Sequence, residues 1–362
     1  MKYTKATTKN ARSPHKDREI DRRVEMPILR TIEEKEHFSS LDLFKFLLAI
    51  MVIAFHTNPF EQCQIPLIDE IAIVLADVTV PFFFCISGFL LARKWGRTKE
   101  ERQAKIIKIL IDTVKLYVIW TLISFPLSVY GYILSGNSWI NCILSYIKYF
   151  FFVGKLFQSY HLWYLLAMIY SLVFILILVH CNRGINSMLL VGVMLYAVRL
   201  GLEYFRLNTD AFPMLAPVVG IYEYIFNNGN IFTGMLYMCI GITVVEKRCC
   251  FSFFASLVLF ITGIVIKYTI HSELGNIIAS SCFFMMVLNI DLPQFPFYII
   301  LRQLSRYMYL VHLICFSGYT LFIGNFNHLG VDSFVATCVL SLAFAVVVTA
   351  IQKRRIRRST TH

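Results

Sequence analysis

Two polar residues in an otherwise apolar segment, Lys45 and His56, are the first candidates for chemistry. They lie in the run LDLFKFLLAIMVIAFHTNPF, which also contains Asp42. Eleven positions separate them, and eleven helical steps of about 100° return nearly to the same face, about 16 Å further along the axis. A neutral imidazole can take a proton from an attacking hydroxyl, and an ammonium can orient a donor or stabilise negative charge. The structural alternative is a lysine that reaches the membrane interface and a histidine that ends the helix.

A second candidate site lies where a pair of small residues precedes a dense group of cations. Ser87 and Gly88 lie in an apolar segment and would let another helix or an elongated ligand approach the main chain. Seven lysines and arginines follow in one short segment: Arg93, Lys94, Arg97, Lys99, Arg102, Lys105 and Lys108. Membrane topology accounts for part of this group, but its density also predicts a site for a phosphorylated donor.

Two further pairs combine a histidine with an aromatic residue. His161 precedes Trp163 at the expected outer end of a helix, where it would contact an acceptor or belong to an interfacial aromatic belt. His312 follows Tyr309 by three positions near the middle of a late apolar segment, where it would support catalysis or make a hydrogen bond in the packed interior. The ten cysteines include no CxxC pair, so the sequence predicts no metal site.

The composition shows which elements must position these residues. With 57% apolar residues, 15% charged residues and a mean hydropathy of +0.65, the chain has more apolar surface than a soluble domain of 362 residues could bury. The sequence predicts an all-α, polytopic integral membrane protein of about ten transmembrane helices. The ten apolar segments are 41–57, 71–92, 106–134, 161–180, 187–205, 230–246, 251–270, 276–290, 304–323 and 333–351. The stretch Ser138–Val153 is apolar but contains a lysine, so we expect an interfacial or re-entrant helix there.

The distribution of basic residues predicts the orientation in the cell membrane. If the N-terminus is cytoplasmic, the cytoplasmic segments contain twenty-seven lysines and arginines and the outward loops four. We therefore expect residues 1–38 to be a charged cytoplasmic tail, residues 39–352 a transmembrane domain, and residues 353–362 a basic cytoplasmic tail. The net charge of +12 thus indicates membrane topology, and nucleic acid is not an expected partner.

Five short motifs together resemble the acyltransferase-3 family of membrane acyltransferases, over residues 40 to about 320. They are a basic residue eleven positions before His56, FFxxSGF (83–89), KxxK (105–108), HLWYL (161–165) and YLVH (309–312). The resemblance implies transfer of an acyl group, by default acetyl, from cytoplasmic acyl-coenzyme A to an outward-facing hydroxyl. The acceptor would be a polysaccharide, a sugar or another cell-envelope component, and no permanently bound cofactor would be needed. His56 would be the catalytic residue.

The resemblance and the basic segment together suggest a path for both substrates. The donor phosphates would bind Lys105 and Lys108, with help from Arg93 or Lys94. The pantetheine arm would pass the Ser87–Gly88 pair toward His56, which would act as general base or accept the acyl group itself. The acceptor would enter near His161 and Trp163. The family typically has Arg at the positions of Lys45, Lys105 and Lys108, so donor recognition would differ here.

Two other functions stay open at this stage. The run around His56 is also similar to the membrane half of the vancomycin-resistance serine racemases. Intramembrane His, Lys and Asp residues occur equally in proton relays, so a transporter or flippase for a small polar solute or an envelope precursor is the main alternative. A catalytically silent membrane module that recruits partners through its charged tail is the third.

Overall fold

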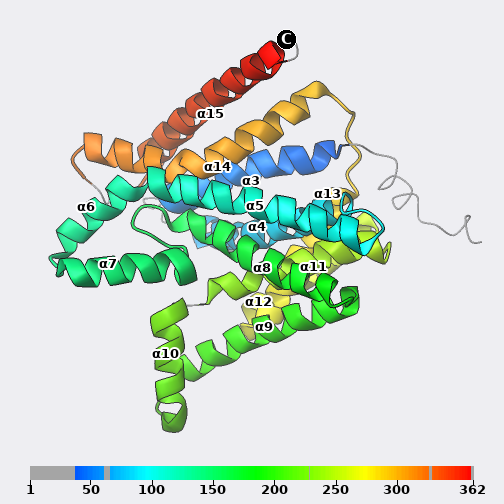
Figure 1. Cartoon of the computed structure of the whole chain (residues 1–362), viewed down its shortest axis with the longest axis horizontal. Coiled ribbons are helices and arrows are strands. Elements are labelled where there is room, and N and C mark those ends of the chain that lie inside the picture. The colour runs from blue at the N-terminus through cyan, green and yellow to red at the C-terminus, as the bar shows by residue number, and fades with distance from the viewer. Residues whose placement is uncertain (1–36, 61–65, 228, 326–327, 360–362) are drawn as a thin grey trace, which may run out of the picture. The chain divides into compact units, whose positions relative to one another are not determined.

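The chain folds into helices throughout the part that the structure describes. A computed structural model describes residues 37–60, 66–227, 229–325 and 328–359, and no strand longer than an isolated bridge occurs among them (Figure 1). The long elements are α3 Ser39–Thr57, α4 Pro66–Ala92, α5 Lys99–Ile123, α6 Phe125–Ser135, α7 Trp139–Lys148, α8 Trp163–His180, α9 Ile185–Leu207, α10 Ala216–Phe226, α11 Thr233–Glu246, α12 Phe253–Ile270, α13 Glu273–Leu288, α14 Pro296–Phe322 and α15 Val331–Ser359. The predicted all-α class is therefore confirmed for these residues. The predicted charged tail lies, up to residue 36, outside them.

Six of the described helices are long and apolar enough to cross a membrane. They are Ser39–Thr57, Glu70–Ala92, Tyr160–His180, Ile185–Leu207, Phe253–Ile270 and Val331–Arg354. The helices of 213–226 and 230–246 add a seventh if they form one broken span. The other expected spans are not both long and apolar enough to meet this description. α5 and α14 contain several basic residues. α11 and α13, with 14 and 16 residues, are shorter than the roughly 20 residues that a bilayer requires.

The segment expected to be one helix over 106–134 is divided in the structure. α5 ends at Ile123 and α6 begins at Phe125, with Ser124 between them. Pro126 lies at the start of α6, where its fixed φ suits a first turn and its missing N–H breaks no helical hydrogen bond. The stretch from Ser138 to Val153 is helical, as expected: Ser138 caps α7, and a π-helical turn, η1 (Tyr149–Val153), continues it.

Small residues let α4 and α11 approach each other closely. A Cβ added to Gly88 would lie 2.9 Å from Cα of Met238 and closer still to its carbonyl oxygen. A Cβ added to Gly241 would lie 2.8 Å from the main-chain N of Phe89. α3 packs against α14, and both contact α15, as the blue, orange and red helices in Figure 1 show. The chain thus places α3, α4 and α14, which carry most candidate residues, in the interior of the bundle.

The helix ends that carry most of the basic residues lie together, at what we call the basic end. Ser39 Oγ donates to the carbonyl of Pro293 at 3.1 Å, joining the starts of α3 and α14. The Arg93 guanidinium stacks on the Phe38 ring at 4.7 Å, which brings the end of α4 to the same place. Gln103 and His180 join α5 to the end of α8 through a contact of 3.2 Å.

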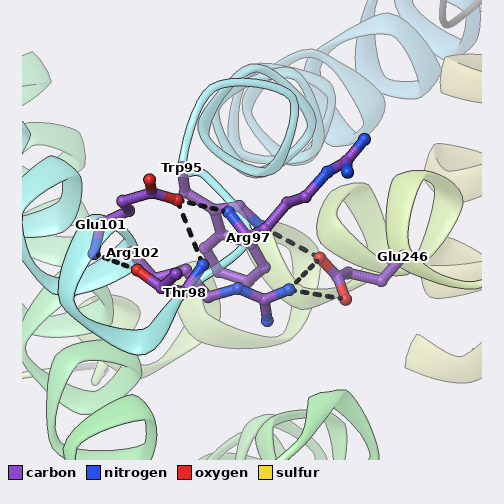
Figure 2. A network of polar contacts seen from close by, with 6 residues as sticks. All are labelled: Trp95, Arg97, Thr98, Glu101, Arg102 and Glu246. Atoms are coloured by element: carbon purple, nitrogen blue, oxygen red, sulfur yellow. Dashed lines mark hydrogen bonds and ion pairs between the residues drawn. The ribbon is translucent and has the colours of Figure 1, made fainter.

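The turn between α4 and α5 is fixed at the basic end by a polar network (Figure 2). Thr98 and Glu101 cap α5 reciprocally through side-chain and main-chain hydrogen bonds. Trp95 Nε1 donates to Glu246 at 3.0 Å, and Arg102 pairs with the same carboxylate at 3.2 Å. The Arg97 side chain points away from Glu246 in this view. Arg102 is therefore engaged in fastening α5 to α11.

Candidate active site

Three histidines far apart in the sequence meet inside the bundle. The rings of His56 at the end of α3 and His312 in α14 have centroids 5.2 Å apart. The ring of His161, in the short turn η2 (Tyr160–Leu162), lies 4.8 Å from that of His312. His161 and His312 are buried, and His56 is partly buried. We call these residues the histidine cluster; each was a candidate from sequence, and the structure brings all three together.

The hydrogen bonds of the two buried histidines define which nitrogen carries the proton. His312 Nδ1 lies 2.7 Å from the carbonyl oxygen of Tyr309, and His161 Nε2 lies 3.1 Å from that of Leu310. A carbonyl oxygen only accepts, so these nitrogens donate and the opposite nitrogens carry lone pairs. His312 Nε2 and His161 Nδ1 are buried without a hydrogen-bond partner among the described residues. Buried unpaired polar atoms are uncommon in folded proteins, and here two occur in one cluster.

Tyr309 borders the histidine cluster, and Tyr164 packs against Tyr309, with the two rings 5.7 Å apart. The Tyr309 hydroxyl donates to the carbonyl of His161 at 2.6 Å, and the rings of these residues lie 5.4 Å apart. The Tyr164 hydroxyl lies 3.0 Å from Ser87 Oγ, and Ser87 itself donates to the carbonyl of Phe83 at 2.8 Å. Ser87 therefore positions a tyrosine of the site from α4, which is a more specific role than the small-residue packing inferred from sequence.

A cavity of about 390 Å³ connects the basic end with these tyrosines, and because half of its lining comes from α14 we call it the α14 cavity. Its apolar wall consists of Phe83, Leu116, Leu165, Met168 and Leu310. Its polar lining consists of Lys45, Tyr164, Arg302, Gln303, Ser305, Arg306 and Tyr309. Arg302 and Leu310 are eight residues apart on α14, about 12 Å along its axis. The cavity thus has cations toward one end and tyrosine hydroxyls, next to the histidine cluster, toward the other.

A buried carboxylate organises the cationic part of the α14 cavity. Asp42 has only 5% of its side chain exposed and lies 3.8 Å from Lys45 Nζ and 3.7 Å from Arg302 Nη1. The Asp42 carboxylate therefore holds two cations at the wall of the cavity, and its charge partly offsets the free-energy cost of burying them. Reasoning from sequence did not identify Arg302 and Arg306 as site residues. Their spacing of four on a helix that also carries Tyr309 and His312 was the available signal.

The residues predicted to bind the donor phosphates lie around the basic end, and the described lining of the α14 cavity does not include them. Arg93 is half-buried against Phe38, whereas Lys94 and Lys108 are exposed. Lys105 is half-buried and lies eleven residues before Leu116, on the same face of α5 and about 16 Å nearer the basic end. Of this group, Lys105 shares a helix face with a lining residue of the cavity, Leu116.

The two remaining predicted residues pack within the bundle. Gly88 is buried against the main chain of Met238 in α11, so it serves the close approach of two helices. Trp163 is half-buried, with its ring 6.2 Å from that of Phe84. The Phe84 ring in turn lies 4.5 Å from the ring of Tyr164. Trp163 thus supports the wall behind Tyr164.

Comparison with known proteins gives relatives that are considerably longer than this chain. One "Amino-acid racemase" of Enterococcus faecalis is 32% identical over 216 residues, which are 58% of this chain and 29% of that protein. A "Serine/alanine racemase" of Enterococcus gallinarum is 28% identical over 220 residues, 58% of this chain and 30% of that protein. The chain thus spans less than a third of the length of these curated relatives. No solved structure matches.

The family comparison covers nearly the whole part of the chain that the structure describes. The family model of the Acyl_transf_3 acyltransferase domain matches residues 38–350, from the start of α3 to the last turns of α15. That range includes the histidine cluster, the α14 cavity and the residues of the basic end. The resemblance inferred from the motifs is confirmed, and the chain belongs to the acyltransferase-3 family.

Proposed function

We propose that this membrane acyltransferase moves an acyl group, by default acetyl, from cytoplasmic acyl-coenzyme A to a hydroxyl of an outward-facing cell-envelope or polysaccharide acceptor. The observation that carries the proposal is the α14 cavity, which has cations at one end and, at the other, Tyr309 and Leu310, each hydrogen-bonded to His161 of the histidine cluster. A donor with a charged head and a flexible, reactive arm requires that arrangement. A carrier for a small solute has no comparable need for a cationic mouth.

The proposed orientation places the basic end in the cytoplasm. The starts of α3, α5 and α14 and the ends of α4, α8 and α11 meet there, so successive long helices run in alternating directions. We infer that α5, α11, α13 and α14 also lie within the bilayer, because each of them packs against one or more of the six apolar helices. This gives about ten spans and leaves both termini on the cytoplasmic side, in accord with the positive-inside rule.

Donor binding follows from the charges of the α14 cavity. Lys45, Arg302 and Arg306 line it and would hold the phosphates. Lys94, whose charge acts on Lys45, and Arg93, Lys105 and Lys108 would attract the donor electrostatically. Arg302 offers the planar fork that Lys lacks, which compensates for Lys at the positions where the family typically has Arg. The apolar wall and Tyr164 would surround the arm that carries the thioester.

The chemistry assigns His56 as general base. The acceptor hydroxyl loses its proton to His56 as its oxygen bonds to the thioester carbonyl carbon. The C–S bond then breaks, and the proton passes to the departing thiolate, so the products are an ester and coenzyme A. The lone pair on His312 lies beside His56 and would accept a hydrogen bond that orients the ring or stabilises its protonated form.

The decisive experiment is transfer of label from radiolabelled acetyl-coenzyme A to envelope material by membranes that contain the protein. We expect His56→Ala to lose at least a hundredfold in rate, because removal of a general base typically costs 10²–10⁴-fold. His180→Ala is the matched control, since His180 is exposed at the basic end and should leave the rate unchanged. Equal rates in wild type and His56→Ala would contradict the assignment.

A second candidate function rests on the racemase relatives, whose matched part accounts for less than a third of their length. A membrane module attached to an amino-acid racemase suits amino-acid transport, and the histidine cluster would then relay protons. Uptake of labelled serine or alanine into proteoliposomes distinguishes the two functions. Uptake that depends on His56, without acetyl transfer from any donor, would favour the transporter.

A further inference from the structure

A second cavity, of about 440 Å³, lies away from the basic end and is built from different elements. It is formed by α6, the α7–η1 helix, the segment 154–160 and the residue that ends α10. We call it the polar chamber because its lining includes Tyr132, Asn137, Tyr149, Lys155, Tyr160 and Asn227. This lining has one cation, three tyrosines and two amides, whereas that of the α14 cavity has three cations, two tyrosines and one amide.

The polar chamber adjoins the histidine cluster through one tightly folded segment. Gly154, at φ 73°, allows the chain to turn back so closely that an added Cβ would lie 2.6 Å from Cα of Trp163. Tyr160 lines the chamber, and the next residue is His161, whose Nε2 donates to the carbonyl of Leu310. Leu310 in turn lines the α14 cavity. His161 therefore lies between the two cavities.

Lys155 is the cation that faces the polar chamber. It is half-buried, and no hydrogen bond or ion pair joins its ammonium to a described residue. Partial burial and the charge of Arg199 lower the pKa of Lys155 below its usual value. The nearby carboxylate Glu203 pairs with Arg199 at 3.4 Å and so is already engaged. A negatively charged ligand would supply the counter-ion that Lys155 lacks.

The remaining lining suits a sugar. The rings of Tyr132, Tyr149 and Tyr160 offer apolar faces for the C–H groups of a pyranose, together with hydroxyls at their edges. The amide of Asn227 offers two donors and an acceptor, and that of Asn137 offers one donor and an acceptor, because its Nδ2 already donates to Ser135 Oγ at 3.1 Å; such groups match vicinal hydroxyls. As in most ligand sites, apolar ring surface is combined here with a few polar groups, which would fix the orientation of the ligand.

We propose that the polar chamber is the acceptor site and that it binds an acidic sugar, with the carboxylate or phosphate on Lys155 and the ring among the tyrosines. Acylation of the bound sugar rests on the proposed function. Binding of the sugar to the chamber does not, because it requires no acyl donor. The sugar would present a hydroxyl at the His161 segment, where the histidine cluster and the α14 cavity meet.

The test is equilibrium binding of three labelled probes to the purified full-length protein without acyl donor. The probes are methyl β-glucuronide, glucose 6-phosphate and the neutral methyl β-glucoside. We expect at least one anionic probe to bind tenfold or more tightly than the glucoside. Lys155→Gln should remove that preference, while Lys155→Arg should retain it because the charge stays in place. Lys247→Gln, an exposed cation at the basic end, is the matched control and should bind as wild type does.

Each outcome decides one point. A preference for glucuronide indicates a uronic acid, and a preference for the phosphate indicates a phosphosugar. Equal binding of charged and neutral probes, no binding of any probe, or an anionic preference that survives in Lys155→Gln would overturn the proposal. Melting temperatures of the variants are measured alongside, so that a misfolded Lys155→Gln is recognised. In that case the binding preference of Lys155→Arg, which keeps the charge, decides. If the wild-type protein binds the anionic sugar but transfers no acyl group, the result would instead count against the proposed function.

Discussion

Asp42 is the residue on which the charged part of the α14 cavity depends. It is nearly fully buried and contacts two cations, Lys45 from its own helix and Arg302 from α14. Removing one partner of such a buried group leaves the others uncompensated, so the three residues act as a unit. Arg302 is the member with the largest exposed fraction, 39% of its side chain, and is therefore the one most accessible to a ligand.

Replacing Arg302 with Gln should raise KM for acetyl-coenzyme A about tenfold, with a smaller effect on kcat. A charge-assisted hydrogen bond to phosphate contributes about 1.5–3 kcal/mol, and Arg302 stands far from the reacting atoms. The measurement is initial rate against donor concentration at fixed acceptor. Arg97→Gln is the control, because Arg97 is an exposed arginine at the same end whose side chain points away from the network in Figure 2. Equal KM values for the two variants would show that net charge alone attracts the donor.

The histidine cluster shows how far residue types alone could lead. The sequence singled out His56, His161 and His312 because each is a costly polar residue in or beside an apolar segment. The ring distances of about 5 Å from His312 to His56 and to His161 follow from the packing of α14 against both α3 and η2 and are not encoded in any local pattern.

Among the elements, α14 contributes most to the site. It supplies Arg302, Arg306, Tyr309 and His312, and its polar residues explain why it is less apolar than a lone membrane span. Such a helix is stable in a membrane only when neighbours cover its polar face, and α3 and α15 pack against it. Its weak hydropathy is thus a consequence of its position inside the bundle.

The close contact of α4 with α11 leads to a prediction about glycines. Gly88→Ala should destabilise the protein by about 1–3 kcal/mol, because its Cβ would meet the main chain of Met238. Gly318→Ala in α14 should be neutral or stabilising by up to about 1 kcal/mol, since nothing lies within 4 Å of its added Cβ. Melting temperatures of the purified variants in one detergent provide the comparison. Equal melting temperatures would mean that α4 and α11 can separate without cost.

At the scale of the whole molecule, the basic end and the polar chamber would lie on opposite sides of the membrane. Single cysteines at Arg97 and Asn137, introduced into a cysteine-free chain, should therefore react differently with an impermeant maleimide. Both positions are exposed. We expect Asn137→Cys to be labelled in intact cells and Arg97→Cys only after permeabilisation. Labelling of both, or the reverse pattern, would contradict the orientation.

The sequence by itself determined the helical class, the membrane environment and the family. Apolar segments long enough to span a bilayer require helices, because no other open structure satisfies the main chain in lipid. The histidine positions and the motifs from His56 to His312 identified the acyltransferase-3 family that the family comparison confirms. These conclusions depend on residue type and spacing, which a linear sequence contains.

Only the tertiary structure decided which cations face a cavity and which fasten helices together. Arg102 and Arg302 are both arginines near a helix start. Arg102 pairs with Glu246 and so joins α5 to α11, whereas Arg302 pairs with Asp42 and lines the α14 cavity. The break at Ser124 and the polar chamber beyond it depend equally on how α6 and α7 pack. These features arise from contacts between residues distant in the chain, so no local pattern specifies them.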